Sequence, residues 1–212
     1  MKILAVAATE LEIDAIQHIT PRKGVSLLKE VVGVGQVATC FHLMDAIAKT
    51  SPDCIVQFGI AGAFSREFSI GDAVVVESEI IGDMGVFENN RFHSIFDLNL
   101  QKENEFPYSS KQLINPHATL LEKTSLKKVT AISVNEITTS PVRMNYYTST
   151  YSSDIESMEG AAFHYCCLMK KIPFVQIRGI SNYVGERNKE LWNIHSALTT
   201  AATSLQTFLS TY

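Results

Sequence analysis

The sequence predicts an α/β fold: a single three-layer α/β/α domain, with helices on both faces of a mixed, mostly parallel central sheet. Apolar segments fit for strands alternate with segments of helical periodicity, an order that usually gives parallel strands. The strand segments are apolar almost without interruption, which is typical of strands covered on both faces. No linker-like stretch divides the chain, so we expect one domain over residues 1–212.

The first part of the chain carries the clearest pattern. We expect strands at 2–8, 26–35, 54–63 and 71–81, and helices at 9–19 and 35–50. Thr9 and Glu12 have the spacing of a capping box, which favours a helix start at this point. Pro52 cannot continue the second helix and separates it from the next strand.

The second part of the chain is less regular. We expect strands at 132–140 and 174–181, and helices at 155–170 and 189–209. Between them, the segment 82–131 is polar with scattered aromatic residues. Two interpretations of this segment stay open: a long loop that contacts substrate, and a solvated excursion with no role in binding.

Composition excludes some classes of partner. The net charge of −4 and the isoelectric point near 5.9 give no electrostatic reason to expect binding to nucleic acid or to an anionic membrane. No run of eighteen apolar residues occurs, and the first residues lack the layout of a cleavable leader. The four cysteines form no CxxC pair, and we expect them to be reduced core thiols of a cytoplasmic protein.

One glycine-rich segment resembles a dinucleotide-binding fingerprint. Gly33, Gly35 and Ala38 fit the pattern G-x-G-x-x-G/A after a strand and before a helix. The fingerprint also requires an acid at the end of the second strand. Asp53 has about the right separation but precedes its strand, so a tight turn explains the glycines better.

Metal and nucleophile chemistry have little support. The six histidines show no paired ligand spacing, and no G-x-S-x-G motif occurs. We therefore expect no metal and no cofactor.

Four polar residues stand at expected strand ends or in apolar surroundings: Glu12, Glu159, Arg178 and Asn182. Ligands of parallel sheets bind at the carboxyl ends of the strands. Glu159 is the least ordinary, because burying an isolated carboxylate costs several kcal/mol or more. Each residue also has a structural explanation: a helix cap for Glu12, an ion pair between Glu159 and Arg178, and a turn at Asn182.

Several motifs together resemble one superfamily. They are "MKILAVAATELEIDAI", "GVGQVA", "FGIAGAF" followed by "IGDAVVV", "SMEGAAF" and "PFVQIRGISN". In this order they resemble the purine nucleoside phosphorylases and nucleosidases, above all the hydrolase branch with the methylthioadenosine/adenosylhomocysteine nucleosidases. The segments "GDMGVFENNRFHSIFDLNL" and "GISNYVGERNKELWNI" are most similar to the futalosine hydrolase subfamily of menaquinone biosynthesis.

The resemblance implies roles for particular residues. It implies that Glu12 activates the attacking water, that Glu159 holds the ribose and that Asn182 faces the base. A positioned carboxylate that takes the proton of water contributes roughly 10²–10⁴-fold to the rate. The expected substrate-binding residues are Ala61, Gly62, Ile137, Thr138, Met158 and Arg178.

Two departures from the superfamily pattern bear on the reaction. Ile60 stands where the phosphorylases have a hydroxyl residue for phosphate, which favours water as the acceptor of the sugar. Asn182 stands where the methylthioadenosine nucleosidases have an aspartate. An amide donates two hydrogen bonds, which could reach N7 and a 6-oxo group, and this favours hypoxanthine over adenine.

The resemblance therefore implies hydrolysis of the N-glycosidic bond of futalosine, with release of hypoxanthine, by a homodimer or larger homo-oligomer. A nucleosidase for an inosine- or methylthioadenosine-type substrate and a non-catalytic nucleoside-binding protein stay open as alternatives. The benzoate at the 5′ end of futalosine requires a cation or backbone donors, for which Arg91, His93 and Arg143 are candidates.

Overall fold

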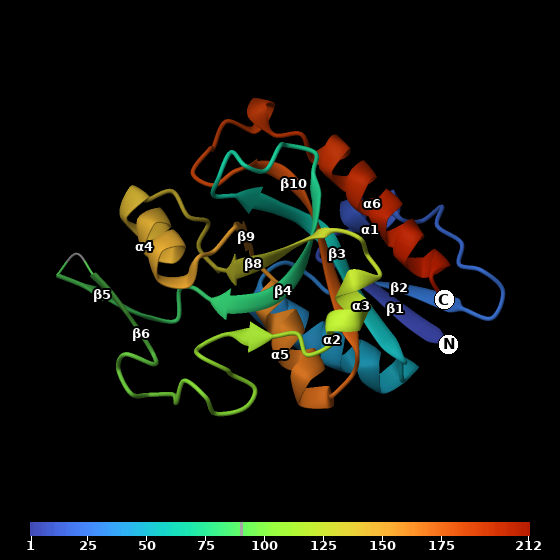
Figure 1. Cartoon of the computed structure of the whole chain (residues 1–212), viewed down its shortest axis with the longest axis horizontal. Helices are drawn as coiled ribbons and strands as arrows, with labels where there is room; N and C mark the ends of the chain where they lie inside the picture. Colours follow the sequence, from blue (N-terminus) through green and yellow to red (C-terminus); the bar gives the residue numbers. More distant parts are fainter. Residues whose placement is uncertain (90) are drawn as a thin grey trace.

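The computed structural model describes residues 1–89 and 91–212 and contains helices on both sides of one large sheet (Figure 1). The strands are β1 (Lys2–Ala7), β2 (Ser26–Val31), β3 (Cys54–Ala63), β4 (Ala73–Ile81), β5 (Gly85–Glu88), β6 (Arg91–Ser94), β7 (Leu113–Ile114), β8 (Lys127–Ser133), β9 (Ile155–Ser157) and β10 (Phe174–Tyr183). The helices are α1 (Glu10–Ala15), α2 (Gln36–Thr50), α3 (Ala118–Glu122), α4 (Pro141–Tyr151), α5 (Gly160–Lys170) and α6 (Ile194–Ser210), with a 3₁₀ turn at Lys189–Leu191.

The large sheet has eight strands and is mixed, as the sequence predicts. Its strand order is β10-β4-β8-β9-β3-β1-β2, and β7 pairs with β4. Five of its pairings are parallel, and the pairings β10–β4, β3–β9 and β4–β7 are antiparallel. An additional pairing joins β10 to β3, so that strands β3, β10, β4, β8 and β9 close on themselves. This closure brings the ends of β3, β9 and β10 together.

Two hydrophobic cores lie on opposite faces of the sheet. On one face, α1 and α6 pack through residues such as Ile13, Leu205 and Phe208. On the other face, α2 and α5 pack through residues such as Leu43 and Phe163. Figure 1 shows these two helix pairs on either side of the strands. The three-layer α/β arrangement is therefore confirmed.

Several predicted boundaries are wrong. The strand expected at 132–140 lies at Lys127–Ser133, and the helix expected at 155–170 begins with the short strand β9. The first helix ends at Ala15 instead of residue 19, β2 ends at Val31, and the last helix starts at Ile194 after a separate 3₁₀ turn. Helix α4, at Pro141–Tyr151, is not predicted at all.

The segment predicted to be irregular, 82–131, contains real structure. It forms the hairpin of β5 and β6, the short strand β7, helix α3 and most of β8. The residue at position 90, within this segment, lies outside the described residues.

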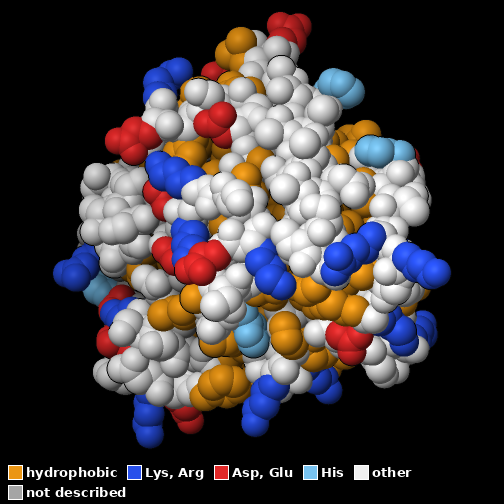
Figure 2. All heavy atoms as spheres, turned by 45° about the vertical axis from the view of Figure 1, so that its right-hand side comes forward, with side chains coloured by type: hydrophobic (Ala, Val, Ile, Leu, Met, Phe, Trp, Pro, Cys, Tyr) orange, Lys and Arg blue, Asp and Glu red, His pale blue; other side chains and the backbone are white. Residues whose placement is uncertain are grey.

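Basic and acidic side chains are interspersed on the face of the molecule seen in Figure 2. This mixed surface agrees with the absence of any strong charge imbalance in the sequence. No helix within the described part of the chain has the length and apolar character to cross a membrane.

Candidate active site

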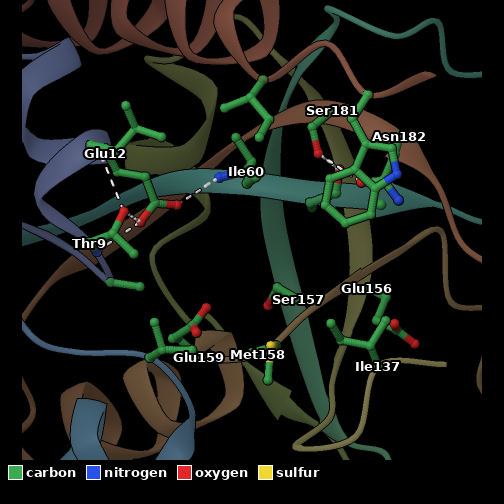
Figure 3. Close-up of a pocket in the computed structure, with 17 residues that line it drawn as sticks. Thr9, Glu12, Ile60, Ile137, Glu156, Ser157, Met158, Glu159, Ser181 and Asn182 are labelled. Atoms are coloured by element: carbon green, nitrogen blue, oxygen red, sulfur yellow. Dashed lines mark hydrogen bonds between the residues drawn. The ribbon is translucent and has the colours of Figure 1, made fainter. Parts of the chain in front are cut away.

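One cavity of about 260 Å³ lies where β1, β3 and β10 end and where β9 leads into α5. Seven of the nine residues predicted for the site line it: Glu12, Ala61, Gly62, Ile137, Met158, Glu159 and Asn182. Figure 3 shows Glu12 and Glu159 on one side of this space and Asn182 on the other. Arg178 and Thr138, the remaining two, do not line the cavity but lie directly behind its wall.

Glu12 both caps a helix and faces the cavity. Its Oε2 accepts hydrogen bonds from the backbone N–H and the hydroxyl of Thr9, both at 3.0 Å, which completes the capping box at the start of α1. Its Oε1 accepts from the backbone N–H of Ile60 at 3.2 Å. The structural and functional interpretations of Glu12 are thus compatible, because the three bonds fix a carboxylate that still lines the cavity.

Arg178 lies beneath Glu12 and Glu159. A Cβ on Gly59 would lie only 2.6 Å from Nη1 of Arg178 and 2.6 Å from Oε1 of Glu12, so a glycine is required where these two side chains meet. Arg178 is 1% exposed, and its Nη1 donates to the carbonyl of Ile60 at 3.4 Å. Its Nε and Nη2 make no hydrogen bond to any residue that the structure describes. Arg178 is therefore a buried positive charge behind the cavity, and the prediction that it contacts substrate is not supported by its position.

Glu159 is the N-cap residue of α5 and is 6% exposed. Its Oε1 accepts from the backbone N–H of Gly35 at 3.0 Å, and its Oε2 is 4.0 Å from Nη2 of Arg178. Burial raises the pKa of Glu159, while the Arg178 guanidinium and the Gly35 N–H oppose this rise. The ion pair expected between Glu159 and Arg178 is therefore present, with a long separation of 4.0 Å. The glycine-rich turn also binds this carboxylate, through the backbone N–H of Gly35.

A bulge in β10 sets the direction of Asn182. Ile180 pairs with Ala61 and Asn182 pairs with Gly62, so that Ser181 is an extra residue in the ladder. The Ser181 hydroxyl donates to Oδ1 of Asn182 at 2.8 Å, and Nδ2 of Asn182 donates to the carbonyl of Tyr183 at 3.0 Å. One N–H of the amide thus remains for a ligand, whereas both N–H groups were expected to face the base.

The floor and the far wall of the cavity are mainly apolar. Met158 and Ile137 line it, and the Ile137 side chain is 40% exposed. Thr138, which was expected beside Ile137 on the base, is 5% exposed and uses its backbone N–H to donate to Oε1 of Glu156 at 3.1 Å. The segment after β8 therefore contributes one side chain to the cavity instead of two.

Five polar or aromatic residues of the cavity are not among the predicted site residues: Thr9, Glu156, Ser157, Ser181 and Trp192. Glu156 was not predicted because residues 155–170 were assigned to a helix. In a helix, Glu156 and Glu159 would not be expected to lie at opposite ends of one cavity. The position of Glu156 two residues before the M-E-G motif was the one available signal. Trp192 follows the 3₁₀ turn that precedes α6, and it lines the cavity. No local sequence pattern indicates this position.

The three residues considered for the benzoate of futalosine lie elsewhere. Arg91 and His93 belong to the hairpin strand β6, and neither lines the cavity. The guanidinium of Arg143 lies 4.5 Å from the ring centre of Phe92 and lines a separate hollow with Phe87 and Ile137. Within the described chain, the position of none of them supports this role.

The cavity has the carboxyl groups of Glu12 and Glu159 on one side and the Asn182 amide on the other, with the Glu156 carboxyl group at the amide end. A carboxylate accepts hydrogen bonds from hydroxyl groups and opposes a positive charge that develops beside it. An amide at the opposite wall can donate to a planar polar ring. The arrangement suits a ligand with a sugar beside Glu12 and Glu159 and a heterocycle at the amide end.

The family model of the phosphorylase superfamily matches residues 9–212. The chain belongs to that superfamily. It is 27% identical over 190 residues to a futalosine hydrolase of Thermus thermophilus, covering 89% of this chain and 83% of that protein. It is 25% identical over 169 residues to a 5′-methylthioadenosine/S-adenosylhomocysteine nucleosidase of Aeromonas salmonicida, covering 76% and 72%.

Solved structures agree in fold. The native futalosine hydrolase of Helicobacter pylori superimposes with a TM-score of 0.82 at 16% identity, covering 98% of this chain and 97% of that one. The methylthioadenosine/adenosylhomocysteine nucleosidase of the same organism, in complex with butyl-thio-DADMe-Immucillin-A, gives a TM-score of 0.83 at 16% identity with the same coverage. At this identity the likeness establishes the fold alone.

Proposed function

We propose that the protein is an N-glycosyl hydrolase that cleaves futalosine into hypoxanthine and dehypoxanthinyl futalosine, a step of menaquinone biosynthesis. The observation that carries the proposal is the placement of Glu12 and Glu159 on one side of a single cavity and of Asn182 on the other (Figure 3). The similarity to futalosine hydrolases over most of the chain supports the choice of substrate.

The proposed mechanism follows from the two acidic groups. The ribose lies over Met158, with its hydroxyl groups donating to Glu159. Water adds to C1′ while Glu12 takes one of its protons, and the bond between C1′ and N9 breaks with its electron pair going to the base. The base acquires a proton from solvent and leaves as hypoxanthine, and Asn182 donates a hydrogen bond that stabilises the negative charge developing on the ring.

Glu159 contributes most where positive charge develops. Cleavage of an N-glycosidic bond gives an oxocarbenium-like sugar, and a fixed carboxylate beside it stabilises the transition state more than the ground state. Burial of Glu159 strengthens this interaction, because the surrounding apolar groups screen charge less than water does.

Hydrolysis is favoured over phosphorolysis by the wall of the cavity at β3. The Ile60 side chain offers no hydrogen bond to an anion, and its backbone N–H already donates to Glu12. A phosphate at this place would also be repelled by the carboxylates of Glu12 and Glu159. The buried Arg178 does not line the cavity and so could not bind it.

A second candidate is a nucleosidase for methylthioadenosine-type substrates. Relatives with that name match 72–88% of the chain at 24–28% identity, which is close to the identity of the futalosine hydrolases. Asn182 argues against this candidate, since an amide cannot protonate a leaving adenine.

The decisive experiment is incubation of the purified protein with futalosine, inosine, adenosine and methylthioadenosine, with and without phosphate. We expect hypoxanthine and a free sugar from futalosine at a rate that phosphate does not change. Preferred release of adenine would support the second candidate. A sugar 1-phosphate that forms only with phosphate would make the protein a phosphorylase.

We further propose a cytoplasmic homodimer or larger homo-oligomer. Four large apolar side chains around the cavity mouth and along α2 are exposed: Leu11, Val34, Val37 and Phe41. Leu11 and Val34 also line the cavity, so a second copy seated on this surface would complete the mouth of the site. Light scattering after gel filtration tests this, and a monomer that is fully active would contradict it.

A further inference from the structure

We propose that Glu156 accepts a hydrogen bond from N1–H of the purine. This contact would make Glu156 a residue that determines specificity for 6-oxopurines. The inference rests on the proposed function, because it assumes that the cavity holds a purine base. It assigns a role to a buried carboxylate that the mechanism above does not use.

Glu156 and Asn182 lie in one row across three neighbouring strands. Gly62 of β3 pairs with Asn182 of β10 on one side and with Glu156 of β9 on the other. Paired residues of a sheet direct their side chains to the same face, and two strand spacings amount to about 10 Å. A purine with a hydrogen bond at each end spans a gap of this order.

The residue between them leaves the space open. Gly62 has no side chain, and a Cβ there would lie 3.1 Å from Nδ2 of Asn182. All three residues of the row line the cavity. Figure 3 shows the carboxyl group of Glu156 beside Ile137, at the same end of the cavity as Asn182.

Only one of the two carboxyl oxygens of Glu156 accepts a hydrogen bond from the described part of the chain. It is 8% exposed, and its Oε1 accepts from the Thr138 N–H at 3.1 Å. Its Oε2 is buried and accepts no hydrogen bond from residues 1–89 or 91–212. A buried acceptor without a donor costs about 1–3 kcal/mol, so its presence in a ligand cavity is explained if the ligand supplies the donor.

The chemistry of the base identifies that donor. A 6-oxopurine such as hypoxanthine carries a hydrogen on N1, whereas N1 of adenine is an acceptor. Burial raises the pKa of Glu156, while its hydrogen bonding with Thr138 favours the ionised form. As a carboxylate, Glu156 can only accept, so it pairs with hypoxanthine and opposes adenine.

Glu156→Gln is the sharpest test, because the amide oxygen can still accept from Thr138 while an NH₂ group replaces Oε2. We expect the ratio of kcat/KM for inosine to that for adenosine to fall about 5- to 150-fold, the equivalent of the 1–3 kcal/mol for one unpaired buried group. Glu136→Gln is the matched control, since Glu136 is an exposed acid near Ile137 that does not line the cavity. The control should keep the ratio of the natural protein.

A second measurement needs no variant and no turnover. Calorimetric binding of hypoxanthine, 1-methylhypoxanthine and adenine to the natural protein should show hypoxanthine as the tightest ligand, with a loss of tenfold or more on methylation of N1. Equal affinity for hypoxanthine and 1-methylhypoxanthine would overturn the role of Glu156.

The outcomes separate the two proposals. Hypoxanthine release from futalosine with an unchanged substrate ratio in Glu156→Gln would overturn the inference and leave the proposed function standing. Failure to cleave futalosine, combined with N1-dependent binding of hypoxanthine that Glu156→Gln abolishes, would overturn the proposed substrate and support the inference.

Discussion

Glu12 is both a helix-capping residue and the proposed catalytic base. Its carboxylate accepts three hydrogen bonds, from Thr9 twice and from Ile60 once, and it lines the cavity at the same time. The same contacts that begin α1 thereby hold the proposed base in place. Catalysis needs such fixed geometry, because a misplaced group loses most of its effect.

Glu12→Gln should separate these two roles. We expect kcat to fall about 10²–10⁴-fold, since the amide keeps the shape of the side chain but cannot take a proton from water. Nucleoside affinity should change little, because the ribose and base contacts come from other residues. Steady-state kinetics and equilibrium binding measure the two effects.

The matched control for Glu12→Gln is Glu10→Gln, an exposed acid in the same first turn of α1. It should leave kcat unchanged. Near-normal turnover in Glu12→Gln would reduce Glu12 to a helix cap.

Asn182 lines the cavity as expected, but its hydrogen bonds differ from expectation. Ser181 and Tyr183 use its oxygen and one of its N–H groups, so a single N–H remains for the base. The proposed discrimination between 6-oxo and 6-amino purines would therefore require more than Asn182, which agrees with the role proposed for Glu156.

Asn182→Asp should narrow the preference for 6-oxopurines without removing it. A protonated aspartate can donate to N7 and accept from a 6-amino group, so kcat/KM for aminodeoxyfutalosine should rise relative to futalosine by about 5-fold or more, on the scale of one buried hydrogen bond. Measurement of both substrates on both proteins provides the ratio. An identical ratio would mean that position 182 does not sense the 6-substituent.

At the scale of elements, the start of α5 is the most constrained point. Among the described residues, Glu159 occupies the N-cap position of this helix without a side-chain capping bond, and the hydroxyl of Ser133 accepts from the Ala161 N–H at 2.8 Å. Behind it, Glu79 accepts from Ser133 at 2.9 Å and from Gln176 at 2.8 Å. This buried network links β4, β8 and β10 to the turn that carries Glu159.

Gly160→Ala should disturb that turn. A Cβ at Gly160 would overlap Oε1 of Glu79 and lie 2.5 Å from Nε2 of Gln176. Helix propensity favours alanine over glycine, yet overpacking of a rigid core costs about 1–3 kcal/mol. We expect a lower free energy of unfolding in urea and a lower kcat/KM, because Glu159 precedes the displaced residue.

The double variant Gly160→Ala/Glu79→Ala is the control, since it removes the overlapping carboxyl group. A coupling energy between the two changes is expected for residues in contact. Strictly additive effects would contradict the overlap.

The boundaries of elements were predictable only where local signals are strong. The capping box of Thr9 and Glu12 and the break at Pro52 mark real ends of α1 and α2. The strand predicted at 132–140 is wrong because its apolar pattern continues past Ser133. Ser133 is the last residue of β8 that pairs with a neighbouring strand, and the Val134 N–H makes a final hydrogen bond to the carbonyl of Ser157 in β9. Pairing with a distant strand decides such boundaries.

At the scale of the molecule, the sequence predicted the α/β class and seven residues that line the cavity. These predictions rest on motifs, which are local. The closure of the sheet and the row formed by Asn182, Gly62 and Glu156 are not local, since they depend on strand pairings between residues about 100 positions apart. Neither periodicity nor composition could have placed Glu156 opposite Asn182.

Burial of ionisable groups couples the stability of the whole molecule to pH. Burial raises the pKa of Glu79 to about 7 from an unfolded value of 4.5. The folded state therefore holds this proton more tightly than the unfolded state. The resulting stability is fully present below pH 4.5 and is lost as the pH rises through about 7. His164 acts in the opposite direction, because burial lowers its pKa to about 4 and its contribution is lost as the pH falls below 6.5.

Glu79→Gln isolates the first of these effects, since His164 is present in both proteins. An amide can hydrogen-bond to Gln176 and Ser133 without titrating. We expect the stability of the natural protein relative to Glu79→Gln to fall by up to roughly 3 kcal/mol between pH 4.5 and pH 8, at 1.36 kcal/mol per pKa unit. Urea unfolding at pH 5, 6, 7 and 8 measures this difference. Glu77→Gln, an exposed acid on the same strand, should show no such trend. Parallel curves for the natural protein and Glu79→Gln would mean that Glu79 titrates alike in the folded and unfolded chains.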